Sequence, residues 1–249
     1  MIRFLIVLFF LGIAPAFSAE ISPNKQYNIG LCIVATGEYD AYAQKLIESA
    51  RTHFCKNHKV KFFVFTNGTI EAASDVVIVP QDRLGWPYDG LKRFHIYEAH
   101  QYLFKDVDYL FAADADMLFV APVGDEILSD LVGTQHPRFV GKRGAYEKNT
   151  ASKACVNRNE GKIYFSGGFC GGKKEELLKL IHQTIGQINA DLQKGFIAVW
   201  HDESHLNRYF VDHPPTRILD PSYCYPENWQ IPYPKKIVAL DKNHAEMRK

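Results

Sequence analysis

Short apolar runs alternate with segments of helical spacing along the first half of the chain. Residues 26–37, 59–66 and 75–79 are apolar runs that predict three buried strands. Residues 42–55 and 91–104 instead repeat apolar side chains at helical intervals. Strands that alternate with helices predict an α/β domain, and such sheets bind their ligands beyond the carboxyl ends of the strands.

A further apolar run, residues 107–120, carries two carboxylates in its middle, Asp114 and Asp116. An ionised carboxylate is strongly disfavoured in apolar surroundings, so its charge must be compensated. Two acids at positions i and i+2 can converge on one divalent cation, and their oxygen ligands suit Mn²⁺ or Mg²⁺. The alternative is that the two aspartates only cap a strand end and a turn. We expect them to lie at the same sheet edge as Thr36 and Gly37.

The second half of the chain predicts one more strand and two more helices. Residues 162–172 form an apolar strand interrupted by two glycine pairs, and glycine permits close approach of the backbone to a ligand. Residues 175–192 predict an amphipathic helix, and residues 201–210 predict another. Residues 133–137 and 146–159 are predicted to be loops.

Composition narrows the class of protein. The 249 residues are 47% hydrophobic and 23% charged, which is typical of a globular protein. The net charge of +1 and the lack of a dominant basic run exclude nucleic acid from the expected partners. Five cysteines without a C-x-x-C pair argue against a structural zinc ribbon. No repeat or linker divides the chain, so we expect one domain over residues 20–249.

Residues 1–19 are expected to be a signal peptide rather than part of the fold. Arg3 supplies a short positive start, residues 4–17 are apolar, and a small-x-small cleavage pattern runs from Ala16 to Ser18. The apolar run is shorter than the about 20 residues that usually span a bilayer, which favours cleavage and a periplasmic or secreted protein. A retained short membrane anchor, with membrane association through the N-terminus, is the alternative.

Two histidines, His201 and His205, stand one helical turn apart at the start of the last predicted helix. That spacing is typical of a zinc-binding pair, but zinc proteases have glutamate directly after the first histidine, where this chain has Asp202. A zinc hydrolase is therefore a weaker interpretation. A dehalogenase-type phosphatase is disfavoured too, because Leu118 stands where that family has Thr or Val. A metal-held sugar nucleotide fits better, with one acid pair for the ion and diphosphate and a separate carboxylate for the anomeric carbon.

Four segments together resemble glycosyltransferase family 6, the family of the ABO histo-blood-group transferases, the α1,3-galactosyltransferases and their bacterial relatives. They are WHDESHLNRY at 200–209, GTQHP at 133–137, the glycine-paired segment 164–172, and KNH at 242–244. The resemblance runs in order from about Asn28 to Arg248. It implies a GT-A fold, which is a Rossmann-like nucleotide-sugar-binding domain with a mixed central sheet. It also implies Mn²⁺ (or Mg²⁺) as cofactor and retaining transfer of GalNAc or Gal from UDP to a galactoside or fucosyl-galactoside glycan in α1,3 linkage.

The resemblance implies roles for individual residues. Asp114 and Asp116 match the metal dyad, and Glu203 matches the nucleophile or oxocarbenium stabiliser. The positions that match donor-binding residues are Val34, Ala35, Thr36, Tyr39, Trp86, Arg93, Ser166, Gly167, Gly168, Asp202, Lys242 and Arg248. The positions that match acceptor-side residues are His136, Ala145, Trp200, Glu203 and Glu227. Ser166 and Gly168 match the positions that distinguish GalNAc from Gal, and the room left by the glycines predicts a preference for UDP-GalNAc.

The chain departs from the family pattern in three places. Many bacterial members have asparagines in place of the dyad and work without metal, whereas this chain keeps both aspartates. Ala145 stands where threonine is usual, and Pro226-Glu227 replaces an acceptor-binding acid, so the acceptor differs from the usual one or is held differently. A catalytically silent carbohydrate-binding relative is the main alternative, and the intact Glu203 counts against it.

Overall fold

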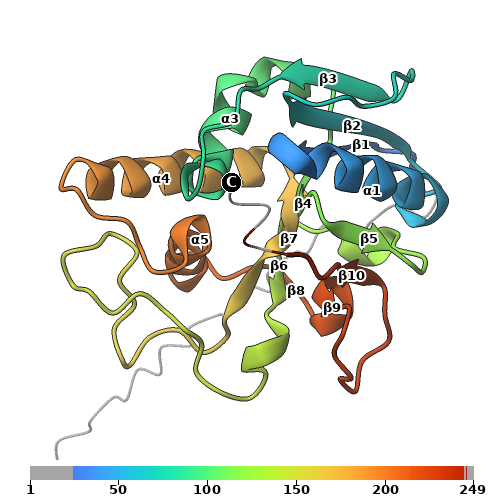
Figure 1. Ribbon diagram of the computed structural model, residues 1–249. Helices are drawn as coiled ribbons and strands as arrows, with labels where there is room; N and C mark the ends of the chain where they lie inside the picture. The colour runs from blue at the N-terminus through green and yellow to red at the C-terminus, as the bar shows by residue number, and fades with distance from the viewer. Residues whose placement is uncertain (1–24, 244, 246–249) are drawn as a thin grey trace, which may run out of the picture.

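The computed structural model describes residues 25–243 and 245. The fold is built on a seven-stranded sheet of order β3-β2-β1-β4-β7-β6-β8 (Figure 1). β1 pairs in parallel with β2 and β4, and β2 with β3, whereas β7 runs antiparallel to β4 and β6. The predicted α/β class with a mixed central sheet is confirmed. The strands are β1 (Asn28–Val34), β2 (Lys59–Thr66), β3 (Val76–Pro80), β4 (Tyr109–Asp114), β6 (Leu131–Gln135), β7 (Phe165–Lys173) and β8 (Arg217–Leu219).

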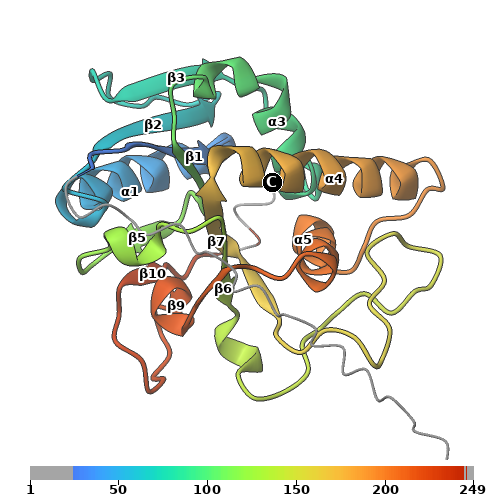
Figure 2. The ribbon, with the colours of Figure 1, turned by 180° about the vertical axis from the view of Figure 1, so that it is seen from behind.

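Helices cover both faces of this sheet. The front and back views show α1 on one face and α3 and α4 on the other (Figures 1 and 2). In β1, Ile29, Leu31 and Ile33 belong to the core under α1, whereas Cys32 belongs to the core under α3 and α4. Because burying one such aliphatic side chain contributes roughly 1.5–3 kcal/mol, this alternation fixes the register of the strand. The helices are α1 (Asp40–His53), α2 (Tyr88–Leu91), α3 (Arg93–Ala99), α4 (Lys174–Leu192) and α5 (His201–Asp212).

A second, three-stranded sheet brings the end of the chain beside the acid pair. Its order is β5-β10-β9, and in Figure 1 the red β9 and β10 lie next to the green β5. The Leu240 N–H donates to the Asp116 carbonyl at 2.9 Å, so the segment after β10 passes the dyad. These strands are β5 (Met117–Phe119), β9 (Tyr225–Pro226) and β10 (Ile237–Ala239).

The acid pair ends a strand instead of lying inside one. Asp114 is the last residue of β4, and Asp116 lies in the turn before β5. The apolar run over residues 107–120 therefore forms two strands with a turn between them, and the two aspartates lie at a strand end and in that turn, as in the alternative interpretation. The turn lets both carboxylates leave the apolar core and reach cations of the chain, which an uninterrupted buried strand would not allow.

Two other predicted elements also differ from the structure. The helix predicted over residues 91–104 is divided, because Lys92 (φ −103°, ψ 11°) and His100 (φ −115°, ψ 19°) leave helical geometry. The loop predicted at 133–137 is mostly strand β6, between β7 and β8. A Cβ on Gly133 would lie only 2.8 Å from the Phe165 ring, so glycine here serves packing rather than a turn.

The N-terminal prediction concerns residues outside the part of the chain that the structure describes. The proposed signal peptide or anchor, residues 1–19, belongs to that part. Within residues 25–243 and 245, no helix has both the length and the apolar character needed to cross a bilayer.

Candidate active site

The main cavity lies beyond the carboxyl ends of the parallel strands. β1 and β4 pair with Val34 opposite Asp114, so the residues that follow both strands meet at one sheet edge, as expected for Thr36 and the dyad. The cavity has a volume of about 430 Å³. Of the predicted site residues, it is lined by Val34, Thr36, Tyr39, Trp86, Arg93, Asp114, Asp116, Gly167, Trp200, Asp202, Glu203 and Lys242.

Each aspartate of the dyad is paired with a cation from another part of the chain. Arg93 Nη1 donates to Asp114 Oδ1 at 2.8 Å, and the Lys242 ammonium group donates to the Asp116 carboxylate. Arg93 Nε also lies 2.8 Å from Asp202 Oδ2. Burial alone would lower the pKa of Arg93, but Asp202 and Asp114 raise it above its ordinary value. These acids explain a cation at the start of α3, where the helix dipole opposes positive charge.

The dyad fits a divalent cation that takes its remaining ligands from a bound diphosphate. Burial raises the pKa of Asp116, although Lys242 opposes the shift. The Lys242 ammonium also lies 5.1 Å from the centroid of the Tyr39 ring, so it is held on two sides. Among the described residues, no three His, Cys, Asp or Glu side chains are grouped to hold an ion. Two carboxylates that line a cavity are nonetheless a suitable protein share of a Mn²⁺ or Mg²⁺ site in which phosphate completes the ligand set.

Glu203, the predicted catalytic carboxylate, lies in the first turn of α5 and has a donor on each oxygen. The Tyr164 hydroxyl donates to Oε1 and the Gly167 N–H donates to Oε2, both at 2.8 Å. Burial raises the pKa of Glu203 to about 7 and that of its neighbour Asp202 to about 6. A carboxylate held at both oxygens can stabilise a developing positive charge without rearranging first.

Tyr164 and Asn207 belong to this site, although the sequence analysis assigns them no role. Asn207 Nδ2 donates to the carbonyls of Phe165 (2.8 Å) and Glu203 (2.9 Å), and its Oδ1 accepts from the Phe165 N–H (2.8 Å). Asn207 thereby joins the start of β7 to α5. The available signal was spacing, since Asn207 stands one helical turn after Glu203 and Tyr164 begins the glycine-paired segment.

Asp89 is another residue that the sequence analysis missed. It lines the cavity, and its Oδ1 accepts hydrogen bonds from Thr36 Oγ1 at 3.2 Å and from the Leu84 N–H at 2.7 Å. Asp89 therefore ties the loop that carries Trp86 to the end of β1. Trp86 itself is 54% exposed and contacts the His201 ring edge-on at 5.6 Å.

The two positions predicted to distinguish GalNAc from Gal lie behind the cavity wall. Ser166 Oγ accepts from the Gly168 N–H at 3.2 Å and lies 3.1 Å from Cys224 Sγ. A Cβ added to Gly168 would lie 3.3 Å from the same sulfur. Gly167 is the glycine of this pair that lines the cavity.

Of the remaining donor-side predictions, one lies behind the cavity and the other cannot be compared with it. Ala35 is fully buried, and its N–H donates to the Phe65 carbonyl at 2.8 Å. Its side chain therefore supports the end of β1 from behind. Arg248 lies outside the described residues.

The predicted acceptor-side residues are spread over three places. Trp200 lines the main cavity and is 51% exposed. Glu227 lines a neighbouring cavity of about 290 Å³, which shares Asp116 and Lys242 with the first. The structure does not bring Glu227 into the main cavity, because its Oε2 accepts the Asp241 N–H at 2.8 Å.

His136 and Ala145 flank Tyr164 instead. The His136 ring lies 5.8 Å from the Tyr164 ring, and burial lowers the pKa of His136 to about 4. Ala145 is partly buried against the small core that Tyr146, Val156 and Tyr164 form. His136 and Ala145 are therefore connected to Glu203 through Tyr164.

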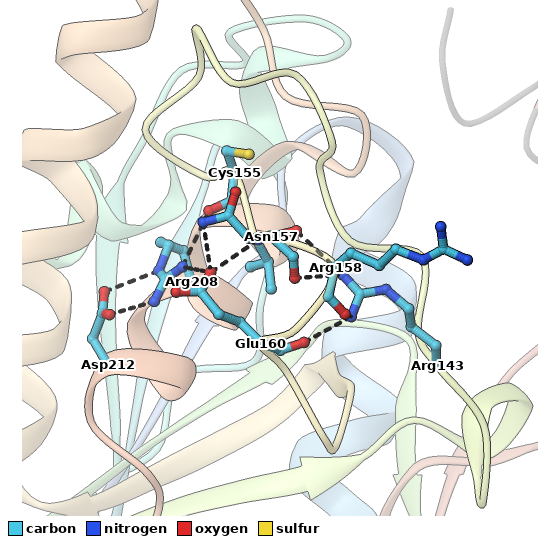
Figure 3. Close-up of polar contacts among 8 residues, drawn as sticks. Arg143, Cys155, Asn157, Arg158, Glu160, Arg208 and Asp212 are labelled. Carbon is cyan, nitrogen blue, oxygen red and sulfur yellow. Dashed lines mark hydrogen bonds and ion pairs between the residues drawn. The ribbon is translucent and has the colours of Figure 1, made fainter.

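Two arginines hold the long irregular segment between β6 and β7, residues 141–163 (Figure 3). Arg143 donates to four backbone carbonyls of this segment at 2.7–3.2 Å. Arg208 of α5 donates to Glu160 Oε2 at 2.9 Å and to the Cys155 carbonyl at 3.2 Å, and it also pairs with Asp212. We call these contacts the arginine clamp.

The two histidines of the zinc interpretation have different surroundings. His201 lines the main cavity, whereas the buried His205 has its Nε2 3.8 Å from Asp191 Oδ2. Burial lowers the pKa of His205 to about 4. Asp191 in turn accepts from the Ser152 hydroxyl at 2.5 Å and from the Lys153 N–H at 2.7 Å. His205 thus belongs to the support of the 141–163 segment.

Nearly the whole chain is similar to known proteins of one kind. The family model described as glycosyltransferase family 6 matches residues 16–249. Histo-blood group ABO system transferase 1 of Rattus norvegicus is 36% identical over 240 residues, which cover 88% of this chain and 68% of that protein. Globoside alpha-1,3-N-acetylgalactosaminyltransferase 1 of Gallus gallus is 32% identical over 242 residues, covering 88% and 69%. O-antigen biosynthesis glycosyltransferase WbnI of Escherichia coli is 28% identical over 228 residues, covering 86% and 94%.

Proposed function

Because this chain belongs to glycosyltransferase family 6, as its motifs predicted, we propose that it transfers GalNAc, or with lower preference Gal, from a UDP-sugar to a galactoside acceptor. The transfer retains the anomeric configuration and forms an α1,3 linkage. The observation that carries this proposal is that Glu203 lines the same cavity as Asp114 and Asp116. One carboxylate is thus available for the sugar and a separate pair for the diphosphate.

The cavity wall offers a place for each part of the donor. Val34 ends the first strand and Thr36 and Tyr39 follow it, at the edge where α/β sheets bind nucleotides, which supports a uridine site. Arg93 and Lys242 bring positive charge to the region of the dyad, which suits a diphosphate. Asp114 and Asp116 would hold Mn²⁺ (or Mg²⁺), and the bound ion would supply Lewis-acid stabilisation of the leaving diphosphate.

Glu203 supports the retaining course of the proposed reaction. The bond between the anomeric carbon and the UDP oxygen breaks, the acceptor hydroxyl forms its bond on the same face of the sugar, and the hydroxyl proton leaves with the departing UDP. Either a glycosyl-enzyme or a same-face displacement needs a carboxylate beneath the ring, where positive charge develops. Asp202, fixed by Arg93, is the acid best placed for hydroxyls of the donor sugar. The Trp200 indole offers an apolar surface for the acceptor galactoside.

The experiment is a transfer assay on the purified protein. UDP-GalNAc and UDP-Gal are each incubated with lactose and with fucosyl-lactose, with Mn²⁺, with Mg²⁺ and with excess chelator. We expect an α1,3-linked product that depends on the metal and forms faster from UDP-GalNAc. Transfer that proceeds fully in excess chelator contradicts the metal proposal. Binding of a glycan without transfer under every condition would support a carbohydrate-binding relative instead.

A further inference from the structure

The Tyr164 hydroxyl is the only side chain among the described residues with a hydrogen bond to the Glu203 carboxylate. It donates to Oε1 at 2.8 Å, while the backbone N–H of Gly167 donates to Oε2. Tyr164 immediately precedes β7, and Glu203 lies in the first turn of α5. Asn207 of α5 joins the two elements through two hydrogen bonds to the Phe165 backbone, and a third to the Glu203 carbonyl lies within α5, so the tyrosine and the glutamate are held in a fixed relation.

The ring of Tyr164 is fixed from all sides. It is 1% exposed, and the Tyr146 ring packs edge-on against it at 4.9 Å. A Cβ on Gly144 would lie 2.1 Å from Tyr164 Cγ, so only glycine permits this approach. Arg143, drawn in Figure 3, holds the backbone around this packing and lies 4.9 Å from the Tyr146 ring centroid. The hydroxyl therefore reaches Glu203 from a rigid base.

The surroundings of Glu203 disfavour its ionised form. Burial is the largest effect that raises its pKa, and Asp202 and Asp114 add to it. The Gly167 N–H and the Tyr164 hydroxyl lower the pKa in return, leaving it at about 7. The titratable or charged groups around it are Tyr164, Asp202, Asp114, Arg93, Cys224 and the cavity-lining Tyr39, Asp89, Tyr97, Asp116, His201 and Lys242.

We propose that Tyr164 is a positioning residue for the transfer, because its hydroxyl orients the Glu203 carboxylate and stabilises the ionised form that faces the anomeric carbon. This inference rests on the proposed function of Glu203. Burial and the nearby Glu203 raise the pKa of Tyr164, so the phenol keeps its proton and acts as a donor. The tyrosine therefore transfers no proton during the reaction. Its hydrogen bond is stronger to the ionised carboxylate than to the protonated acid.

The first test is Tyr164→Phe, which keeps the ring and removes the donor. We expect kcat at neutral pH to fall about 10- to 100-fold with little change in the KM for the donor, because a hydrogen bond to a charged group is lost. The acidic limb of the kcat profile should move to higher pH by about one unit or more, since protonated Glu203 is inactive. The loss should therefore shrink as the pH rises to about 9.

Tyr146→Phe is the matched control. Tyr146 belongs to the same ring cluster, but its hydroxyl donates to the Ile163 carbonyl at 2.7 Å and not to Glu203. This variant should unfold at a lower temperature and keep the acidic limb of the wild type. If Tyr164→Phe also keeps that limb, Tyr164 is only a packing residue and the proposal is wrong.

A second variant and a second readout guard against misfolding and inactivity. Site-specific fluorotyrosine at position 164 keeps the ring and makes the hydroxyl a stronger donor, so the acidic limb should move to lower pH. Nuclear magnetic resonance titration of isotopically labelled glutamate, with the Glu203 signal assigned from Glu203→Gln, reports the pKa without any turnover. A raised Glu203 pKa in Tyr164→Phe supports the hydrogen bond even if the protein transfers no sugar. An unchanged pKa overturns it.

Discussion

Two arginines, Arg93 and Arg208, show how differently the cavity and the arginine clamp use charge. The Arg93 side chain is 6% exposed, pairs with Asp114 and Asp202, and has no hydrogen-bond partner for Nη2 among the described residues. The Arg208 side chain is 12% exposed, and its three nitrogens are all bonded, to Glu160, Asp212 and a backbone carbonyl. Buried charge is thus incompletely satisfied at the cavity and fully satisfied at the clamp.

The two arginines meet different requirements: Arg93 serves the reaction proposed for the cavity, and Arg208 orders the backbone of the 141–163 segment. Incompletely satisfied buried charges lower stability, and proteins keep them where a reaction uses the charge. A guanidinium group whose three nitrogens all have partners instead orders backbone that has no helix or strand of its own. We therefore expect changes at the cavity to alter chemistry with little loss of stability. Changes at the clamp should alter order and acceptor binding with little effect on chemistry.

The strongest test of this comparison is Glu203→Gln, which keeps the shape of the side chain and removes its charge. We expect turnover to fall about 100- to 1,000-fold, because the charge beneath the anomeric carbon is lost. Glu175→Gln is the control, since Glu175 is an exposed acid in the first turn of α4 and distinguishes a general helix-dipole effect from catalysis. Normal turnover in Glu203→Gln would mean that Glu203 only stabilises the N-terminus of α5.

At alkaline pH, Glu203→Gln should be at least as stable as the wild type. The pKa of Glu203 is raised from 4.5 to about 7, so the folded state binds more protons than the unfolded state between these values. Stability therefore falls as the pH rises through this window, and the penalty is fully present above about pH 7. Glutamine removes the penalty. Thermal unfolding at about pH 8 should show a midpoint equal to or above that of the wild type.

The next largest effect concerns the dyad and Lys242. Asp116→Asn should weaken Mn²⁺ and UDP-sugar binding together and lower turnover more than about tenfold, because one of two protein oxygens loses its charge. Isothermal titration with Mn²⁺ and UDP measures this. Lys242→Ala should strengthen Mn²⁺ binding in the absence of UDP, since the ammonium group no longer occupies the Asp116 carboxylate. Unchanged Mn²⁺ affinity in both variants would show that the dyad does not bind the ion.

Gly167 and Gly168 extend the comparison to the cavity wall. A Cβ on Gly167 would lie 3.2 Å from Arg93 Nη2 and 3.5 Å from Glu203 Oε2, whereas one on Gly168 would meet Cys224 behind the wall. We expect Gly167→Ala to lower kcat/KM about 5- to 10-fold for UDP-GalNAc and less for UDP-Gal, because a small group in a pocket discriminates modestly. Gly168→Ala is the control. If Gly168→Ala lowers kcat/KM for UDP-GalNAc relative to UDP-Gal as strongly as Gly167→Ala does, the donor sugar extends behind the cavity wall to Gly168.

The regular half of the molecule was predictable from sequence. Its strands are apolar runs and α1 has apolar residues at helical spacing, so local pattern and global fold agree there. The sequence singled out the dyad because acids are unusual in an apolar run, Arg93 because a cation is unusual at a helix start, and Glu203 through the family resemblance. The structure brings all of them to one cavity. The strand end at Asp114 and the turn at Asp116 were only the alternative interpretation, because a period-two pattern cannot reveal where a strand gives way to a turn.

The irregular half was not predictable in the same way. The segment 141–163 has no periodic pattern, and all four hydrogen bonds that Arg143 makes with it go to backbone carbonyls. A carbonyl has the same chemistry in every residue, so the sequence holds no mark of these contacts. The contact of Tyr164 with Glu203 spans 39 positions and depends on the docking of α5 against β7. Tertiary contacts of this kind appear only once the fold is known.

The smallest expected effect is that of Glu160→Gln, which weakens the clamp without touching the cavity. Glu160 Oε2 accepts from Arg208 and from the Asn157 N–H at 2.9 Å, so its charge links α5 to the 141–163 segment. We expect the KM for the acceptor to rise about two- to fivefold, because Ala145 lies on that segment and an exposed ion pair contributes little. The KM for the donor and kcat should stay near the wild type.

Asp212→Asn makes this last experiment decisive, because it removes the other carboxylate from the same arginine. Asp212 lies on α5 together with Arg208, and its carboxylate pairs with Arg208 within that helix. If the segment's position matters for the acceptor, only Glu160→Gln raises the acceptor KM, although both variants lose an ion pair. Equal effects would mean that Arg208 acts through the stability of α5 itself. The clamp and the cavity would then share one function, since α5 also carries Glu203.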